Sequence, residues 1–105
     1  MRCENILPHE KNNMLHRYIK KILSANVYDV AVETPVSPAR SLSKRMDNNI
    51  LFKREDLQPI YSFKIRGAYN CISQLSQAQQ ASGLVAASAG NHAQGVAMSA
   101  KYLGI

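Results

Sequence analysis

The residue best suited to chemistry in this sequence is Lys64, in the segment YSFKIRGAYN at residues 61–70. Apolar residues at helical spacing predict a helix from about Ser62 to Ala78, with Ser62 as its N-cap and Lys64 in its first turn. The positive end of a helix disfavours a cation by about 0.3–1 kcal/mol, and the neighbouring Arg66 adds to this effect. Because a lysine amine in such a position is a better nucleophile towards carbonyl groups, Lys64 is a candidate for a Schiff base.

A second candidate site lies in the segment SAGNHAQG, residues 88–95. Small residues let a ligand approach the backbone, and Ser88, Asn91 and His92 add polar side chains. The helix that follows supplies free N–H groups, which suit a carboxylate or a phosphate. The alternative is an ordinary strand-to-helix turn capped by Asn91, with His92 as a structural hydrogen-bonding residue. No second His or Cys stands at a metal-ligand spacing from His92, so no metal site is expected.

Helices and strands that could position these segments follow one another along the chain. Residues 1–13 are polar and are predicted to be a loose end, whereas an apolar stripe over residues 14–23 predicts a helix. Prolines are expected to prevent regular structure at residues 33–38, and residues 41–47 are predicted to form a short helix. Residues 50–52 predict a buried strand, residues 83–89 a second strand, and a last helix is expected to end at Gly104.

The order strand, helix, strand predicts a right-handed βαβ unit with parallel strands in an α/β fold. In such sheets ligands bind beyond the carboxyl ends of the strands. The loop before Lys64 follows one of these ends, and the segment 88–95 follows the next. We therefore expect both segments to open into the same crevice.

The composition limits the class of partner. The net charge is +6, but no basic run exceeds two residues, which argues against nucleic-acid binding and favours a small anionic ligand. No apolar run is long enough to span a membrane, and the N-terminus lacks a secretory signal. The two cysteines, Cys3 and Cys71, show no disulfide or metal pattern and favour the cytoplasm, with Cys71 expected in helix packing.

An amine nucleophile and an anion-binding loop in one crevice suit an aldehyde that carries acidic groups. Pyridoxal phosphate has this chemistry. The residues alone leave open a phosphate-binding enzyme that forms no Schiff base.

The segments KREDLQPIYSFKIRGAYN and ASAGNHAQGVA closely resemble the N-terminal part of the threonine dehydratase (threonine ammonia-lyase) family, in its biosynthetic form. This family belongs to the fold-type II, tryptophan synthase β-like enzymes that depend on pyridoxal phosphate. The resemblance covers about residues 15–105. It implies that residues 14–105 are the N-terminal part of a catalytic domain that is truncated at residue 105.

The resemblance also implies roles for individual residues. Lys64 is the lysine that binds the cofactor covalently, Phe63 packs beside its ring, and Asn91 hydrogen-bonds the 3-oxygen of the ring. Ser88, Ala89, Gly90, Asn91 and His92 are implied to receive the substrate carboxylate. The segment Lys53–Asp56 is a family signature that we interpret as a structural ion-pair cluster. No role follows from the sequence for Arg66.

The activity implied is β-elimination on L-threonine to give 2-oxobutanoate and ammonia, the first step of isoleucine biosynthesis, with L-serine as a further substrate. The resemblance implies a homo-oligomer, a tetramer, for the full-length enzyme. The glycine-rich loop that holds the cofactor phosphate and the C-terminal regulatory domain of the family are not present, so the chain alone is expected to bind the cofactor weakly or not at all. Serine racemase, serine dehydratase and a non-catalytic remnant of such a gene remain alternatives.

Overall fold

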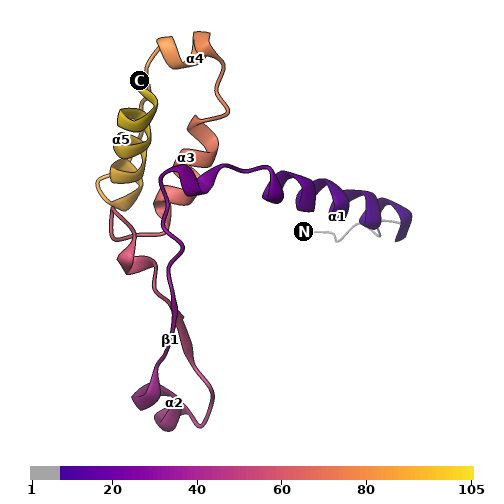
Figure 1. Cartoon of the computed structure of the whole chain (residues 1–105), viewed down its shortest axis with the longest axis vertical. Helices are drawn as coiled ribbons and strands as arrows, with labels where there is room; N and C mark the ends of the chain where they lie inside the picture. Colours follow the sequence, from indigo (N-terminus) through magenta and orange to yellow (C-terminus); the bar gives the residue numbers. More distant parts are fainter. Residues whose placement is uncertain (1–7) are drawn as a thin grey trace.

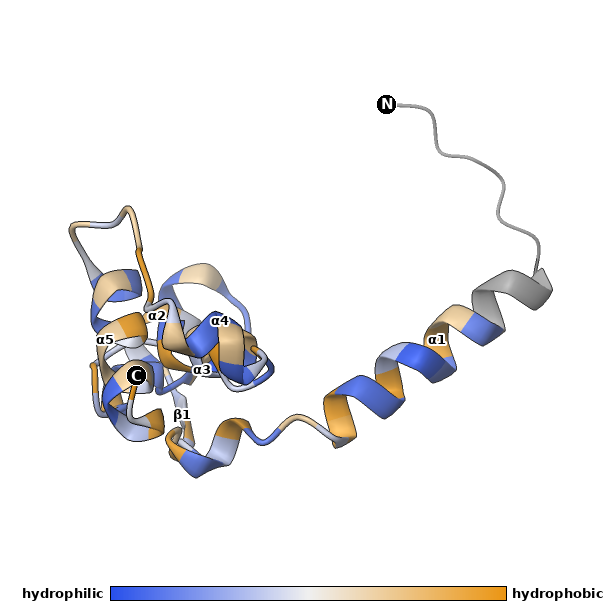
Figure 2. Cartoon of the chain, turned by 90° about the horizontal axis from the view of Figure 1, so that it is seen from above, coloured by the Kyte–Doolittle hydropathy of each residue, from blue (hydrophilic) through white to orange (hydrophobic). Residues whose placement is uncertain are grey.

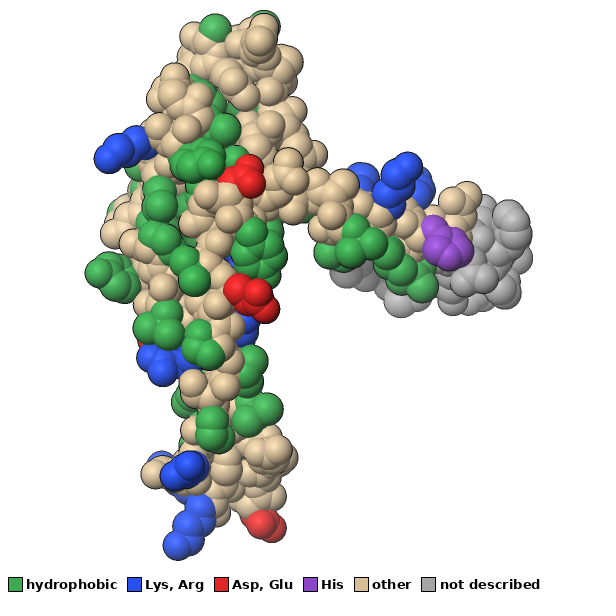
Figure 3. Space-filling model, in the orientation of Figure 1, with side chains coloured by type: hydrophobic (Ala, Val, Ile, Leu, Met, Phe, Trp, Pro, Cys, Tyr) green, Lys and Arg blue, Asp and Glu red, His purple; other side chains and the backbone are tan. Residues whose placement is uncertain are grey.

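The first helix, α1 (Pro8–Leu23), projects from the rest of the protein in the computed structural model, which describes residues 8–105 (Figure 1; Figure 2). The predicted apolar stripe is present, and its side chains are exposed along one face of the helix (Figure 3). The helix begins at Pro8, within the segment predicted to be a loose end. Residues 1–7 of that prediction lie outside the described residues.

A long arm follows, built from β1 (Val36–Pro38), α2 (Arg40–Met46) and β2 (Leu51–Lys53). The two strands pair antiparallel, with Val36 opposite Lys53. The predicted parallel pair, of residues 50–52 with residues 83–89, is a different one and is wrong for the described residues, because residues 50–52 pair with β1 instead. The expectation that the prolines bar regular structure is also wrong. The sheet has only two strands, so each is an edge strand, where proline is tolerated.

The two sides of the arm are also joined by backbone hydrogen bonds beyond both ends of the paired strands. At the base, the Arg54 N–H donates to the Pro35 carbonyl at 3.0 Å, and near the tip the Ala39 N–H donates to the Ile50 carbonyl at 2.9 Å. The predicted strand and the predicted short helix are therefore confirmed in position. The strand is exposed rather than buried, because nothing in residues 8–105 covers it.

The helix predicted over residues 62–78 is divided into α3 (Lys64–Ile72) and α4 (Gln77–Ala81). The division has a local cause at Ser76, whose hydroxyl accepts the Gln79 N–H while the Gln79 side chain accepts the Ser76 N–H. This capping box starts a new helix, because it satisfies N–H groups that have no partner in a first turn. The last helix, α5 (Asn91–Leu103), ends as predicted at Gly104, in the left-handed conformation that glycine favours.

Residues 83–89, the second predicted strand, pair with no other strand in residues 8–105. The side chain of Val85 is fully exposed. A strand needs a neighbour to satisfy its backbone N–H and C=O groups, and no described segment takes that place. The predicted βαβ unit is therefore not formed in the described residues.

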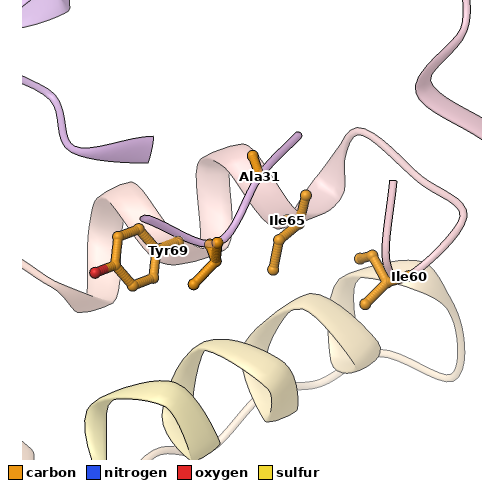
Figure 4. Close-up of a cluster of buried hydrophobic side chains, with 5 residues drawn as sticks. Ala31, Ile60, Ile65 and Tyr69 are labelled. Carbon is orange, nitrogen blue, oxygen red and sulfur yellow. The ribbon is translucent and has the colours of Figure 1, made fainter. Parts of the chain in front are cut away.

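The core lies where the segment after α1 crosses α3. This segment includes the short 3-10 helix η1 (Val27–Asp29), and a second one, η2 (Glu55–Leu57), leads towards α3. The buried cluster contains Val30, Ala31, Ile60, Ile65 and Tyr69 (Figure 4). Met98 and Leu103 of α5 pack against it. The Tyr69 hydroxyl donates a hydrogen bond of 2.7 Å to Asp29. The first turn of α3 is thus held directly by the core.

Candidate active site

Lys64 is the first residue of α3, and its side chain is exposed. Its ammonium nitrogen lies 4.9 Å from the centroid of the Phe63 ring, which is itself 58% exposed. Phe63 occupies the N-cap position, whereas Ser62, the predicted cap, accepts the Lys64 N–H at 3.3 Å through its hydroxyl. Within the described part of the chain, Lys64 makes no ion pair. Its ammonium group is therefore accessible to solvent and not bound by a carboxylate in residues 8–105.

The loop before Lys64 contains a feature that the sequence did not indicate. Tyr61 has a φ of +55°, in the left-handed region that residues with a Cβ rarely occupy. Its N–H donates to the Gln58 carbonyl at 2.7 Å, which closes a tight turn. Such a conformation costs about 1 kcal/mol or more and persists only where the surrounding structure enforces it. The chain is thus bent sharply just before the lysine.

The second segment leads into the N-terminus of α5. Gly90 is the N-cap and offers no side-chain hydrogen bond, while Asn91 and His92 form the first turn, exposed to solvent. The Gly90 N–H donates to the Ser88 hydroxyl at 3.3 Å. The first N–H groups of α5 have no partner within the helix and suit an anion. That Ser88, Ala89, Gly90, Asn91 and His92 receive a carboxylate stays a prediction.

The starts of α3 and α5 lie at the same end of the molecule. Gly95 of α5 packs against the backbone of Lys64, and Tyr102 further along α5 meets Tyr69 of α3 with ring centroids 5.7 Å apart. Because both contacts advance in the same direction, the two helices run parallel (Figure 1). Asn91 is one helical turn before Gly95, so Lys64 and Asn91 are brought to one end of the helix pair.

Gly95 allows this close approach because it has no side chain. A Cβ at Gly95 would lie 3.2 Å from the Lys64 carbonyl oxygen and 3.2 Å from the Ala68 Cβ. In contrast, a Cβ at Gly67 of α3 would meet nothing within 4 Å. The distance between the two helices at the lysine is therefore set by a glycine.

We expect Gly95→Ala to reduce the free energy of unfolding by about 1–3 kcal/mol relative to Gly67→Ala, because the added methyl group overpacks the contact at Lys64. Both substitutions bring the same gain in helix propensity, so Gly67→Ala is the matched control. Urea denaturation of the two variants measures the difference. Equal stabilities would show that the helices have room to move apart.

His92 lines a hollow of about 210 Å³ between α3, α5 and residues 84–86, together with Cys71 and Val96. Gly67 and Ala68, about one helical turn after Lys64, line the same hollow. Cys71 is a free, exposed thiol in this part of the molecule. Both the predicted structural role of His92 and its implied part in binding the substrate carboxylate stay predictions.

Arg66 forms an ion pair that no pattern in the sequence predicted. Its Nε and Nη2 donate to the two carboxylate oxygens of Glu55 at 2.8 and 2.9 Å. These bonds lower the pKa of Glu55 to about 2, although partial burial opposes the shift, and they raise the pKa of Arg66. The expectation that Arg66 disfavours the charge of Lys64 must be corrected, because Glu55 compensates the guanidinium.

The segment Lys53–Asp56 was predicted to be a structural ion-pair cluster, and three of its four residues form ion pairs. Arg54 binds Asp56 in a second bidentate pair, at 2.8 and 2.6 Å, which raises the pKa of Arg54 and lowers the pKa of Asp56. Glu55 pairs with Arg66, as described above. Lys53 instead donates to the carbonyl of Thr34 across the base of the arm.

The sequence of residues 27–105 matches the family model of pyridoxal-phosphate-dependent enzymes. The chain belongs to this family. The family assignment made from the motifs around Lys64 and Asn91 is confirmed, and so is the fold family. Pyridoxal phosphate is the cofactor by which the family is described.

Relatives within the family are threonine dehydratases. The chain is 59% identical over 88 residues to a biosynthetic L-threonine dehydratase from Pasteurella multocida, covering 84% of this chain and 17% of that protein. It is 52% identical over 88 residues to a mitochondrial threonine dehydratase from Saccharomyces cerevisiae, covering 84% and 15%. The chain spans 15–18% of the length of the curated relatives that it matches.

A solved structure has the same fold. The processed form of threonine deaminase isoform 2 from Solanum lycopersicum superposes with a TM-score of 0.81 at 49% identity, over 88% of this chain and 25% of that chain. The part of this chain that the family model covers, residues 27–105, contains the helix pair and the arm.

The residues present fit the family cofactor in two respects. Lys64 offers an exposed amine without an ion-pair partner in residues 8–105, and α5 offers free N–H groups at the same end of the helix pair. In the same residues, no group of three or more His, Cys, Asp or Glu could hold a metal ion. None of the described helices combines the length and the apolar character that a membrane span requires.

Proposed function

We propose that the protein deaminates L-threonine to 2-oxobutanoate and ammonia with pyridoxal phosphate bound covalently at Lys64, in the biosynthesis of isoleucine. The observation that carries this proposal is that the exposed Lys64 and the N-terminus of α5 lie at the same end of the helix pair. Similarity to the threonine dehydratases, at 51–59% identity, supports the choice of substrate. When bound, pyridoxal phosphate withdraws electrons from the substrate and so weakens its Cα–H bond.

The residues of the chain have separate tasks in this proposal. The Nζ of Lys64 holds the cofactor and later accepts the α-proton of the substrate. Phe63 packs beside the cofactor ring, and Asn91 hydrogen-bonds its 3-oxygen. The loop from Ser88 to His92 binds the substrate carboxylate through the free N–H groups of α5. The α-proton and β-hydroxyl leave as water, and a second water hydrolyses the resulting imine to 2-oxobutanoate and ammonia.

The test is to incubate the full-length enzyme with pyridoxal phosphate, reduce it with borohydride, and locate the label by peptide mass spectrometry. We expect the label at Lys64 and the formation of 2-oxobutanoate from L-threonine. Lys64→Ala should abolish both, whereas Lys101→Ala, an exposed lysine in the last turn of α5, should change neither. Activity that survives in Lys64→Ala, or a label on other lysines alone, would contradict the proposal.

The same assay separates the alternatives. With L-serine, pyruvate indicates a dehydratase that also uses serine, and D-serine indicates a racemase. A protein that captures no cofactor at Lys64 is a non-catalytic remnant.

We also propose that the protein acts in the cytoplasm as a homo-oligomer, a tetramer. The free thiol of Cys71 supports a reducing compartment. Relatives from plants and yeast carry chloroplastic or mitochondrial names, so the compartment differs among them. Sedimentation velocity measures the assembly, and a monomer at micromolar concentration would contradict the tetramer.

A further inference from the structure

Arg66 stands two residues after Lys64 and has no part in the proposed chemistry. Its guanidinium binds Glu55 through two N–H bonds and donates a third, of 3.1 Å, to the carbonyl of Val32. The ring of Tyr28 lies 5.2 Å from the guanidinium carbon, on the segment that precedes the core. The side chain is thus held by groups from two separate segments, and 25% of its surface is exposed.

Glu55 is equally well held. Its carboxylate accepts the Thr34 hydroxyl at 2.6 Å and the Gln58 side-chain amide at 3.2 Å, in addition to the bonds from Arg66. Gln58 is almost fully buried and binds both backbone groups of Val32, accepting its N–H at 2.9 Å and donating to its carbonyl at 2.8 Å. The pair is therefore part of a closed network between residues 32–34, η2 and α3.

The helix geometry relates this network to Lys64. Successive side chains leave a helix about 100° apart, so Lys64 and Arg66 lie on either side of Ile65. Ile65 is completely buried in the core, and Arg66 enters the network. Lys64 is left on the remaining side and is exposed, with its carbonyl group against Gly95. Rotation of the first turn of α3 would move all three side chains together.

The first turn of α3 has few other constraints. It contains no acidic residue, and its N-cap Phe63 makes no side-chain hydrogen bond. The bond from the Lys64 N–H to the Ser62 hydroxyl is long, at 3.3 Å. The orientation of this turn therefore depends on Ile65, on the contact with Gly95, and on Arg66.

We propose that Arg66, bound to Glu55, is a positioning residue that fixes the rotation of the first turn of α3 and so aims the Lys64 amine towards the start of α5. This inference rests on the proposed role of Lys64 in binding the cofactor. Arg66 itself touches neither cofactor nor substrate in this role.

The test measures how much pyridoxal phosphate is needed to label half of Lys64 after borohydride reduction. We expect Arg66→Ala to raise this concentration by about tenfold or more, because a small displacement of a reacting group has large effects. Arg66→Lys, which keeps the charge, should recover part of the loss. Arg54→Ala removes a bidentate pair of the same type from the exposed Asp56 and should have no effect.

A second control distinguishes positioning from stability. Ile72→Val removes a buried methylene at the other end of α3, outside the network. This variant should label as the native protein does, under conditions in which both are folded. If Ile72→Val and Arg66→Ala shift the labelling equally, Arg66 only stabilises the helix and the inference is wrong.

Hydrogen exchange tests, without any cofactor, whether the bond between Arg66 and Glu55 fixes the first turn of α3. The backbone N–H of residue 66, which donates to the Phe63 carbonyl at 3.1 Å, should exchange at least about tenfold faster in Arg66→Ala. In Arg54→Ala its exchange rate should not change. If this N–H exchanges in Arg66→Ala at the rate found in the native protein, the inference is wrong even if Lys64 is labelled. If exchange is faster in Arg66→Ala but Lys64 of the native protein is not labelled, the proposed function is wrong. The bond between Arg66 and Glu55 is then a structural feature only.

Discussion

Replacing Ile65 with alanine should lower the free energy of unfolding by about 4 kcal/mol. Ile65 is the most buried side chain of the core and lies among Val30, Ala31, Ile60 and Tyr69. The substitution removes three methyl or methylene groups and leaves a cavity, and such changes in well-packed cores cost about 2–5 kcal/mol. The upper part of this range applies because residues of α3, of α5 and of the loops that contain Val30 and Ile60 meet at this point and cannot all collapse into the space.

Urea denaturation of Ile65→Ala measures this loss. The control is Ile22→Ala in α1, whose side chain is 70% exposed and which should change stability by no more than about 0.5 kcal/mol. Ile65→Val should lose about 1 kcal/mol, a value between the losses expected for Ile22→Ala and Ile65→Ala. A small loss in Ile65→Ala would mean that the core around α3 is not the main stabilising contact of the chain.

Acid should remove about 2–3 kcal/mol of stability through Glu55 alone. The pKa of Glu55 is lowered from its ordinary value of 4.5 to about 2, chiefly by the hydrogen bonds from Arg66. A carboxyl group with a lowered folded-state pKa stabilises the fold fully above its unfolded pKa, and this stabilisation is lost as pH falls towards the folded value. A difference of one unit in pKa corresponds to about 1.36 kcal/mol of stability. The contribution is somewhat smaller here because 17% of the Glu55 side chain is exposed to solvent, which screens the charge.

The measurement is the free energy of unfolding of the native protein and of Glu55→Gln between pH 7 and pH 2. The native protein should lose more stability than the variant below about pH 5, and the difference between the two curves isolates Glu55 from the other carboxylates. Asp56→Asn is the control, because the exposed pair with Arg54 is screened by solvent and should leave the curve nearly unchanged. Parallel curves for the native protein and Glu55→Gln would show that the ion pair does not persist in solution.

Local signals in the sequence predicted a good part of the fold. Gly104 marked the end of α5, and the apolar stripe marked most of α1. The division between α3 and α4 could also have been predicted, since Ser76 and Gln79 stand at the spacing of a capping box. The position of Lys64 at a helix start was likewise readable from the segment around it.

Other features depend on contacts between distant residues. Glu55 and Arg66 are eleven positions apart, and no helical or strand period brings them together. The segment around Val85 has the composition of a strand, but a strand exists only where a neighbour pairs with it. The antiparallel pairing of β1 and β2 joins residues that are distant in the sequence, such as Val36 and Lys53.

The arm between Pro35 and Arg54 has a consequence for how the chain tolerates change. Its two ends are hydrogen-bonded to each other at the base, directly beside Thr34 and Glu55. Its tip, where Asp47 turns the chain in the left-handed conformation, is exposed and far from the helix pair (Figure 1). Residues inserted or deleted at the tip would alter the reach of the arm but not the register at its base. The arm is thus a region where length can vary while the surroundings of Lys64 stay the same.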